Sequence, residues 1–156
     1  MNALEVRKAS KEDLEFLASV LILADQDRLA GREGWDREQF VDRCRTQTGE
    51  EVTGKVANSL TSVVEADGVP VGRLRVVRTS EELFIAGIQV LPEHQGRGIG
   101  SRVVRSVIDE GKREGLPVRL EVGKDNPDAK RLYLRLGFSV IEDRDTMELM
   151  EIRPDA

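Results

Sequence analysis

Residues 88–101 read Ile88-Gln-Val-Leu-Pro-Glu-His-Gln-Gly-Arg-Gly-Ile-Gly-Ser101, an apolar strand-like run followed by a loop with three glycines. Gly96, Gly98 and Gly100 lack Cβ atoms, so the backbone of this loop can approach a ligand closely. An amphipathic helix follows directly, and its unpaired N–H groups and positive dipole end face the same place. The segment is typical of a phosphate cradle, although a glycine-softened turn between a strand and a helix explains the hexapeptide 95–100 equally well.

The spacing of these glycines excludes the two common nucleotide-binding patterns. A dinucleotide fingerprint needs G-x-G-x-x-G, whereas the glycines here alternate as G-x-G-x-G. A Walker loop ends in Gly-Lys-Ser/Thr, whereas Gly100 is followed here by Ser101 and Arg102. A nucleotide-dependent oxidoreductase is therefore a weak alternative.

Composition favours one soluble domain that spans residues 1–156. Hydrophobic residues make up 39% of the 156 residues, which is enough for one core. No apolar run approaches the roughly 20 residues of a membrane span, and the first residues lack the basic start and apolar middle of a signal peptide. We therefore expect a cytoplasmic protein without a membrane partner. With one cysteine, Cys44, and one histidine, His94, we expect no disulfide, no metal site and no catalytic thiol.

The charge pattern favours a small anionic ligand. A net charge of −5 disfavours binding to nucleic acid. Arg97, Arg102 and Arg105 nevertheless form a local basic group at the glycine loop. A nucleotide-bearing cofactor fits this pattern better than a nucleic-acid duplex does. The acidic charge on the rest of the protein favours a cationic second substrate.

Hydrophobic periodicity predicts seven strands and four helices. The expected strands cover residues 4–7, 60–66, 69–77, 83–90, 118–122, 138–141 and 146–152. The expected helices begin after the caps Ser10, Asp36 and Asn126 and at Ile99, whereas residues 24–36 show no clear period and are predicted to form a loop. Strands 83–90 and 118–122 flank one helix and are predicted to be parallel. Gly87 predicts a bulge or a close backbone contact.

Two motifs together resemble the signatures of the GNAT N-acetyltransferase family. Residues Gln95-Gly96-Arg97-Gly98-Ile99-Gly100 meet the family's pattern Gln/Arg-x-x-Gly-x-Gly/Ala. The second motif is Asn126-x-x-Ala129-x-x-Leu132-Tyr133-x-x-Leu136-Gly137-Phe138. The resemblance covers residues 60–152 well and the first 58 residues by element order only. It implies an α/β (α+β) fold, with a mixed, mostly antiparallel sheet of six to seven strands and about four helices.

The resemblance also implies acetyl-CoA as co-substrate, with no metal. The residues expected to bind it are Ile88, Gln89, Val90, Gln95, Gly96, Arg97, Gly98, Ile99, Gly100, Ser101, Asn126 and Tyr133. The pyrophosphate would lie on the N–H groups of residues 96–101, and the pantetheine arm would run beside residues 88–90. The N–H of Val90 would stabilise negative charge on the thioester oxygen.

The expected catalytic residues are Tyr133 and Glu82. By the resemblance, Tyr133 would protonate the leaving thiolate, whereas its spacing alone favours a core aromatic residue. Many family members carry a glutamate where this chain has Phe84. Glu82 projects to the same side as Phe84 in a regular strand and is our candidate base, with Glu81 or a water chain as alternatives.

The function implied is that of an acyltransferase, an acetyl-CoA-dependent N-acetyltransferase. An amine of a small molecule, an amino-acid derivative or a peptide N-terminus would attack directly in a ternary complex. The alternative is a non-catalytic module that binds or senses acyl-CoA. The acceptor is not readable from the sequence, and exposed strand edges allow a homodimer.

Overall fold

The computed structural model describes residues 3–155, which form a seven-stranded sheet with strand order β1-β2-β3-β4-β5-β7-β6. The strands are β1 Leu4–Lys8, β2 Ser59–Ala66, β3 Val69–Arg78, β4 Leu83–Val90, β5 Val118–Gly123, β6 Ser139–Arg144 and β7 Met147–Ile152. The helices are α1 Leu14–Leu29, α2 Arg37–Val52, α3 Ile99–Glu114 and α4 Pro127–Leu136, with short 3-10 helices η1 Lys11–Asp13 and η2 Pro92–His94. Pairs β1–β2, β5–β7 and β6–β7 are antiparallel, whereas β4–β5 is parallel. The predicted fold class, element order and parallel pair are confirmed.

The chain divides into two compact units. The first comprises the chain up to Arg75 together with Gly87–Gly100, and the second comprises Val76–Ala86 together with the chain from Ser101 onward. The chain therefore passes from one unit to the other inside β3, inside β4 and inside α3. No helix within residues 3–155 has the length and apolar character needed to cross a membrane.

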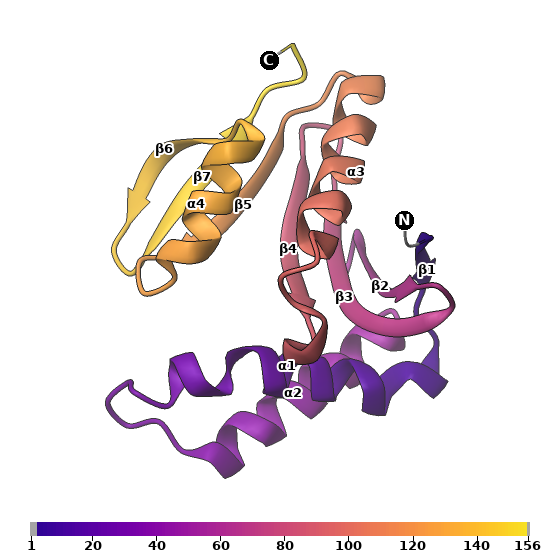
Figure 1. Ribbon diagram of the computed structural model, residues 1–156, viewed down its shortest axis with the longest axis vertical. Helices are drawn as coiled ribbons and strands as arrows, with labels where there is room; N and C mark the ends of the chain where they lie inside the picture. The colour runs from indigo at the N-terminus through magenta and orange to yellow at the C-terminus, as the bar shows by residue number, and fades with distance from the viewer. Residues whose placement is uncertain (1–2, 156) are drawn as a thin grey trace. The chain divides into compact units, whose positions relative to one another are not determined.

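In the first unit, α1 and α2 lie side by side (Figure 1). Leu21 of α1 packs against Phe40 and Cys44 of α2, and Leu29 and Trp35 pack around this cluster. The predicted loop over residues 24–36 is wrong in its first part, because α1 continues to Leu29. The contact of Leu29 with the cluster stabilises this extra helical turn, which the local sequence pattern did not reveal.

Cys44 is confirmed as a packed core thiol. Its side chain belongs to the buried cluster of α1 and α2. Burial raises the pKa of this thiol, so it carries less thiolate at neutral pH than an exposed cysteine. Asp36 caps α2 as predicted, because its carboxylate accepts a hydrogen bond from the Gln39 N–H at 3.2 Å.

The predicted hairpin between β2 and β3 is confirmed at its turn. Asp67 and Gly68 adopt φ angles of 52° and 79°, the left-handed pair that a two-residue hairpin turn requires. Strand β2 pairs with β1, from Leu4↔Ala66 to Lys8↔Ser62. The hairpin brings Arg73 and Arg75 of β3 to positions where they contact α2, as described below.

In the second unit, α4 packs on the sheet formed by β5, β7 and β6 (Figure 1). Asn126 caps this helix by accepting from the Ala129 N–H at 3.4 Å, and Gly137 ends it in the left-handed conformation at φ 107°. Both features agree with the sequence prediction. The parallel ladder of β4 and β5 pairs Leu83↔Val118 through Ile85↔Leu120.

Candidate functional site

The glycine loop between η2 and α3 has the left-handed backbone that the predicted phosphate cradle needs. Gly96 and Gly98 adopt φ angles of 80° and 76°, a conformation that side-chain-bearing residues rarely take. A Cβ added at Gly96, Gly98 or Gly100 would meet no atom within 4 Å. Backbone conformation therefore requires glycine at positions 96 and 98, whereas crowding inside the protein requires it at none of the three positions.

The loop also has unpaired donors. Within residues 3–155, the N–H groups of Gly96, Arg97 and Gly98 donate to no backbone oxygen. The first N–H groups of α3, which begins at Ile99, have no partner within the helix. Successive free N–H groups at a helix N-terminus attract phosphate through hydrogen bonds and the helix dipole. These residues fit the pyrophosphate of a coenzyme A molecule.

Side chains of the loop hold it against the end of β4. The Gln95 side-chain amide donates to the Val90 carbonyl oxygen at 3.0 Å. The Arg97 guanidinium lies 3.4 Å from the His94 ring nitrogen Nδ1 and stays exposed. The structure thus brings the predicted residues of β4 and of the loop together in the first unit.

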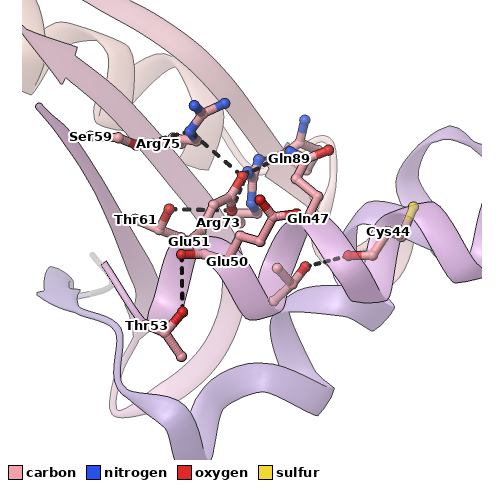
Figure 2. Close-up of polar contacts among 11 residues, drawn as sticks. Cys44, Gln47, Glu50, Glu51, Thr53, Ser59, Thr61, Arg73, Arg75 and Gln89 are labelled. Carbon is pink, nitrogen blue, oxygen red and sulfur yellow. Dashed lines mark hydrogen bonds and ion pairs between the residues drawn. The ribbon is translucent and has the colours of Figure 1, made fainter. Parts of the chain in front are cut away.

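A buried charged cluster joins α2, β3 and β4 in the same unit (Figure 2). The side chains of Arg73 and Glu51 are each 1% exposed, and Arg73 Nη2 donates to both Glu51 carboxylate oxygens at 2.9 and 3.0 Å. Arg73 Nη1 donates to the Gln89 side-chain oxygen at 2.7 Å. The Nε atom of Arg73 has no hydrogen-bond partner in the described chain. This cluster connects a strand of the predicted cofactor site to α2.

Close approaches at two glycines make this cluster possible. A Cβ at Gly87 would lie 2.3 Å from Arg73 Nη1, so only glycine leaves room for the guanidinium. The sequence predicted a bulge or a close backbone contact at Gly87, and the structure places a side chain there. The close backbone contact lies at Gly72, where a Cβ would be 2.6 Å from the Gln89 carbonyl oxygen.

The remaining predicted site residues belong to the second unit. Tyr133 is 9% exposed, and its ring packs edge-on against Phe138 with 5.9 Å between ring centroids. Asn126 is the cap of α4, and Ser101 lies in the first turn of α3. Each of the two units thus carries part of the predicted set.

Glu82, the candidate base, is engaged by a cation. Its carboxylate oxygen Oε1 lies 3.1 Å from Arg119 Nη1, and Arg119 Nε also donates to Glu151 at 2.8 Å. These two carboxylates raise the pKa of Arg119, and the hydrogen bond with Glu151 has the larger effect. Glu81 is exposed at the strand entry. The ion pair gives the Glu82 carboxylate a structural partner.

Sequence reasoning missed Glu51, Arg73 and Arg75. One signal was present: Arg73 and Arg75 occupy alternate positions inside a valine-rich strand, so both point to one face of the sheet. Charged residues on one face of an apolar strand need a partner. The partner, Glu51, could not be read from the pattern of α2.

The chain matches the model of the acetyltransferase (GNAT) family over residues 21–138, and it belongs to this family. Among solved structures, the PaiA N-acetyltransferase of Thermoplasma acidophilum in complex with coenzyme A aligns with a TM-score of 0.80 at 22% identity, over 97% of this chain and 99% of that one. The spermidine N-acetyltransferase of Vibrio cholerae in complex with CoA and spermine aligns with a TM-score of 0.69 at 20% identity, over 97% and 96%. Because the sequence identity to these two structures is 22% and 20%, the similarity shows a shared fold alone.

Curated relatives match over a shorter segment. The spermidine N(1)-acetyltransferase of Escherichia coli strain K12 is 34% identical over 82 residues, which cover 50% of this chain and 44% of that protein. An uncharacterized N-acetyltransferase of Methanocaldococcus jannaschii is 36% identical over 84 residues, which cover 49% and 37%. The chain thus matches less than half the length of these relatives.

Proposed function

We propose that the protein is an N-acetyltransferase that moves the acetyl group of acetyl-CoA to a primary amine of a small molecule, an amino-acid derivative or a peptide N-terminus. The observation that carries this proposal is the loop 96–100, where two left-handed glycines face open space directly before α3. Family membership supports it, as does the coenzyme A bound by the Thermoplasma neighbour.

In this proposal most of the residues that bind the cofactor belong to the first unit. The N–H groups of residues 96–101 hold the pyrophosphate, and the exposed Arg97 adds a positive charge. Backbone groups of Ile88–Val90 hold the pantetheine arm, and the Val90 N–H stabilises negative charge on the thioester oxygen. Acetyl-CoA supplies the activated acyl group when bound.

Two side chains of the second unit are proposed to move protons. Tyr133 would hold the proton that the leaving thiolate needs. An alkyl ammonium has a pKa of about 10, so the acceptor must lose a proton before it attacks. Glu82 remains a candidate for this task, with Glu81 or a water chain as alternatives.

A non-catalytic acyl-CoA binding module is the second candidate. Two observations favour it: Phe84 stands where many family members carry a glutamate, and Arg119 engages the Glu82 carboxylate. Release of free thiol separates the two functions. An enzyme releases coenzyme A thiol when an amine is supplied, whereas a module binds acetyl-CoA and releases none with any acceptor. Because of the relatives' names, the amine panel should include spermidine.

The decisive experiment compares acetyl-CoA binding to the parent protein and to a Gly98→Glu variant by calorimetric titration. A glutamate at this position puts a side chain and a negative charge into the open space of the cradle, so we expect saturable binding by the parent and none by the variant. Gly34→Glu is the matched control, because Gly34 has the same φ of 76° and also faces open space, in the loop between α1 and α2.

The Gly34→Glu variant should bind acetyl-CoA as the parent does. A parent that shows no binding up to about millimolar ligand, where sites worth ~4 kcal/mol are detected, would end the proposal. Equal binding by the folded Gly98→Glu variant would remove the loop as the site.

A further inference from the structure

A pocket of about 420 Å³ lies in the first unit, next to the buried charged cluster. Its lining includes Asp42, Arg43, Glu50 and Glu51 of α2 and Arg75 of β3. Glu51 belongs to both the pocket wall and the cluster, and Arg73 links Glu51 to Gln89 of β4. The pocket is therefore separated by a short chain of side chains from the strand that we propose binds the acetyl-CoA arm.

The charge of Glu51 is already satisfied inside the protein. Both of its oxygens accept from Arg73, and they also accept from Gln47 at 2.8 Å and from Thr61 at 3.3 Å. One buried carboxylate thus faces two guanidinium groups, those of Arg73 and Arg75. Glu51, Arg73 and Arg75 together carry one positive charge in excess, and Arg75 is the positively charged one of the three that lines the pocket.

Arg75 is held so that its terminal nitrogens stay available. Its Nε donates to Ser59 Oγ at 2.9 Å and lies 3.5 Å from Glu51 Oε2. Its two terminal nitrogens have no acceptor in residues 3–155, and Figure 2 shows them turned away from Glu51. The side chain is 20% exposed. The edge formed by the two terminal nitrogens of this fixed, partly buried guanidinium matches the planar geometry of a carboxylate.

We propose that this pocket recognises the carboxylate of the acceptor, so that the acetylated amine belongs to an amino acid or a similar zwitterion. Arg75 binds the carboxylate, and Arg43, which also lines the pocket, adds a second positive charge. The carboxylates of Asp42 and Glu50 in the same lining favour a ligand that also carries a positive ammonium group, and they repel simple dianions. This inference rests on the proposed acetyltransferase function and names its substrate class.

The test uses matched pairs of amines that differ in the carboxylate alone: L-methionine with methioninamide, and each other amino acid with its amide. L-lysine is also paired with cadaverine. Thiol release from acetyl-CoA gives kcat/KM for each member. We expect the parent to prefer the acid of at least one pair, and Arg75→Gln to reduce that preference about tenfold or more. Comparing the preference between parent and variant cancels the difference in amine pKa within a pair.

Arg75→Gln should fold, because Arg73 still neutralises Glu51. Arg75→Lys should retain part of the preference, since a lysine keeps the charge without the planar fork. Arg45→Gln is the control: Arg45 also lies on α2, but its side chain is 50% exposed and paired with Glu15 instead of lining the pocket. Its preference should equal that of the parent.

Binding without turnover separates this inference from the proposed function. The same pairs are titrated into the protein with and without coenzyme A. Carboxylate-dependent binding that Arg75→Gln removes would support the pocket even if no amine released thiol, in which case only the acetyltransferase proposal fails. Three outcomes would each overturn the pocket assignment. They are acetylation of amines with no preference for the acid, a preference that is unchanged in Arg75→Gln, and no binding by any acid.

Discussion

Tyr133 shows how a residue of the second unit can be tested alone. Its ring is buried on α4 and packs against Phe138, so the apolar part of the side chain already has a structural role. The proposed chemistry uses the hydroxyl group only. A substitution that removes this oxygen and keeps the ring therefore tests the proposed chemistry while it preserves the packing against Phe138.

We expect Tyr133→Phe to keep the fold and to lower kcat by about 10²-fold or more, because general-acid catalysis by a positioned side chain contributes ~10²–10⁴-fold. KM for acetyl-CoA should change little. Steady-state kinetics over pH 6–9 measure both constants. Phe138→Leu is a packing control. It should lower the free energy of unfolding and have only a small effect on kcat. An unchanged kcat in Tyr133→Phe would remove the assignment of the proton donor.

At the scale of elements, the pair Glu51–Arg73 is what attaches α2 to β3 and β4. A buried ion pair is weak support for stability as a whole, because both ions lose their hydration. Removing one partner is costly, because it leaves a charge buried and unpaired. Arg75 lies 3.5 Å from Glu51 and offsets only part of that loss.

Arg73→Met should therefore destabilise the protein by about 3–5 kcal/mol, whereas the double variant Glu51→Leu/Arg73→Met should recover most of the loss, because neither charge remains. Urea unfolding curves with unchanged slopes provide the comparison. Thr61→Val is the mild control, since it removes a single hydrogen bond to Glu51 at 3.3 Å. A double variant no more stable than Arg73→Met would show that the polar cluster itself specifies this packing.

At the scale of the whole molecule, the prediction of one domain over residues 1–156 can be tested by unfolding. The two compact units are continuous through β3, β4 and α3, and each crossing falls inside a strand or a helix. Melting one unit would break these elements in the middle. We therefore expect one cooperative transition.

Scanning calorimetry should give a calorimetric enthalpy equal to the van't Hoff enthalpy, as for a two-state domain. Two resolved transitions, or a calorimetric enthalpy about twice the van't Hoff value, would show that the units unfold independently. A sedimentation experiment on the same samples tests whether the protein forms the homodimer that its strand edges allow. The cytoplasmic location also stays a prediction.

Local chemistry explains which predictions from the sequence succeeded. The caps Asp36 and Asn126, the Asp67-Gly68 turn and the left-handed Gly137 depend on atoms within a few residues, so their patterns are readable in one dimension. The glycine loop belongs to the same class, because positive φ angles at Gly96 and Gly98 are a local demand. The end of α1 was misjudged because Leu29 is helical through a contact with distant residues.

The amino-acid sequence therefore determined the element order, the left-handed glycine loop and the family resemblance, all of which rest on local spacing. The tertiary structure alone decided the environment of the site. Glu51, Arg73 and Gln89 are separated by 22 and 16 positions along the chain, yet their side chains form one buried cluster. Periodicity reports which face of an element is apolar. It does not report which charged side chain meets which, because that depends on how the elements pack.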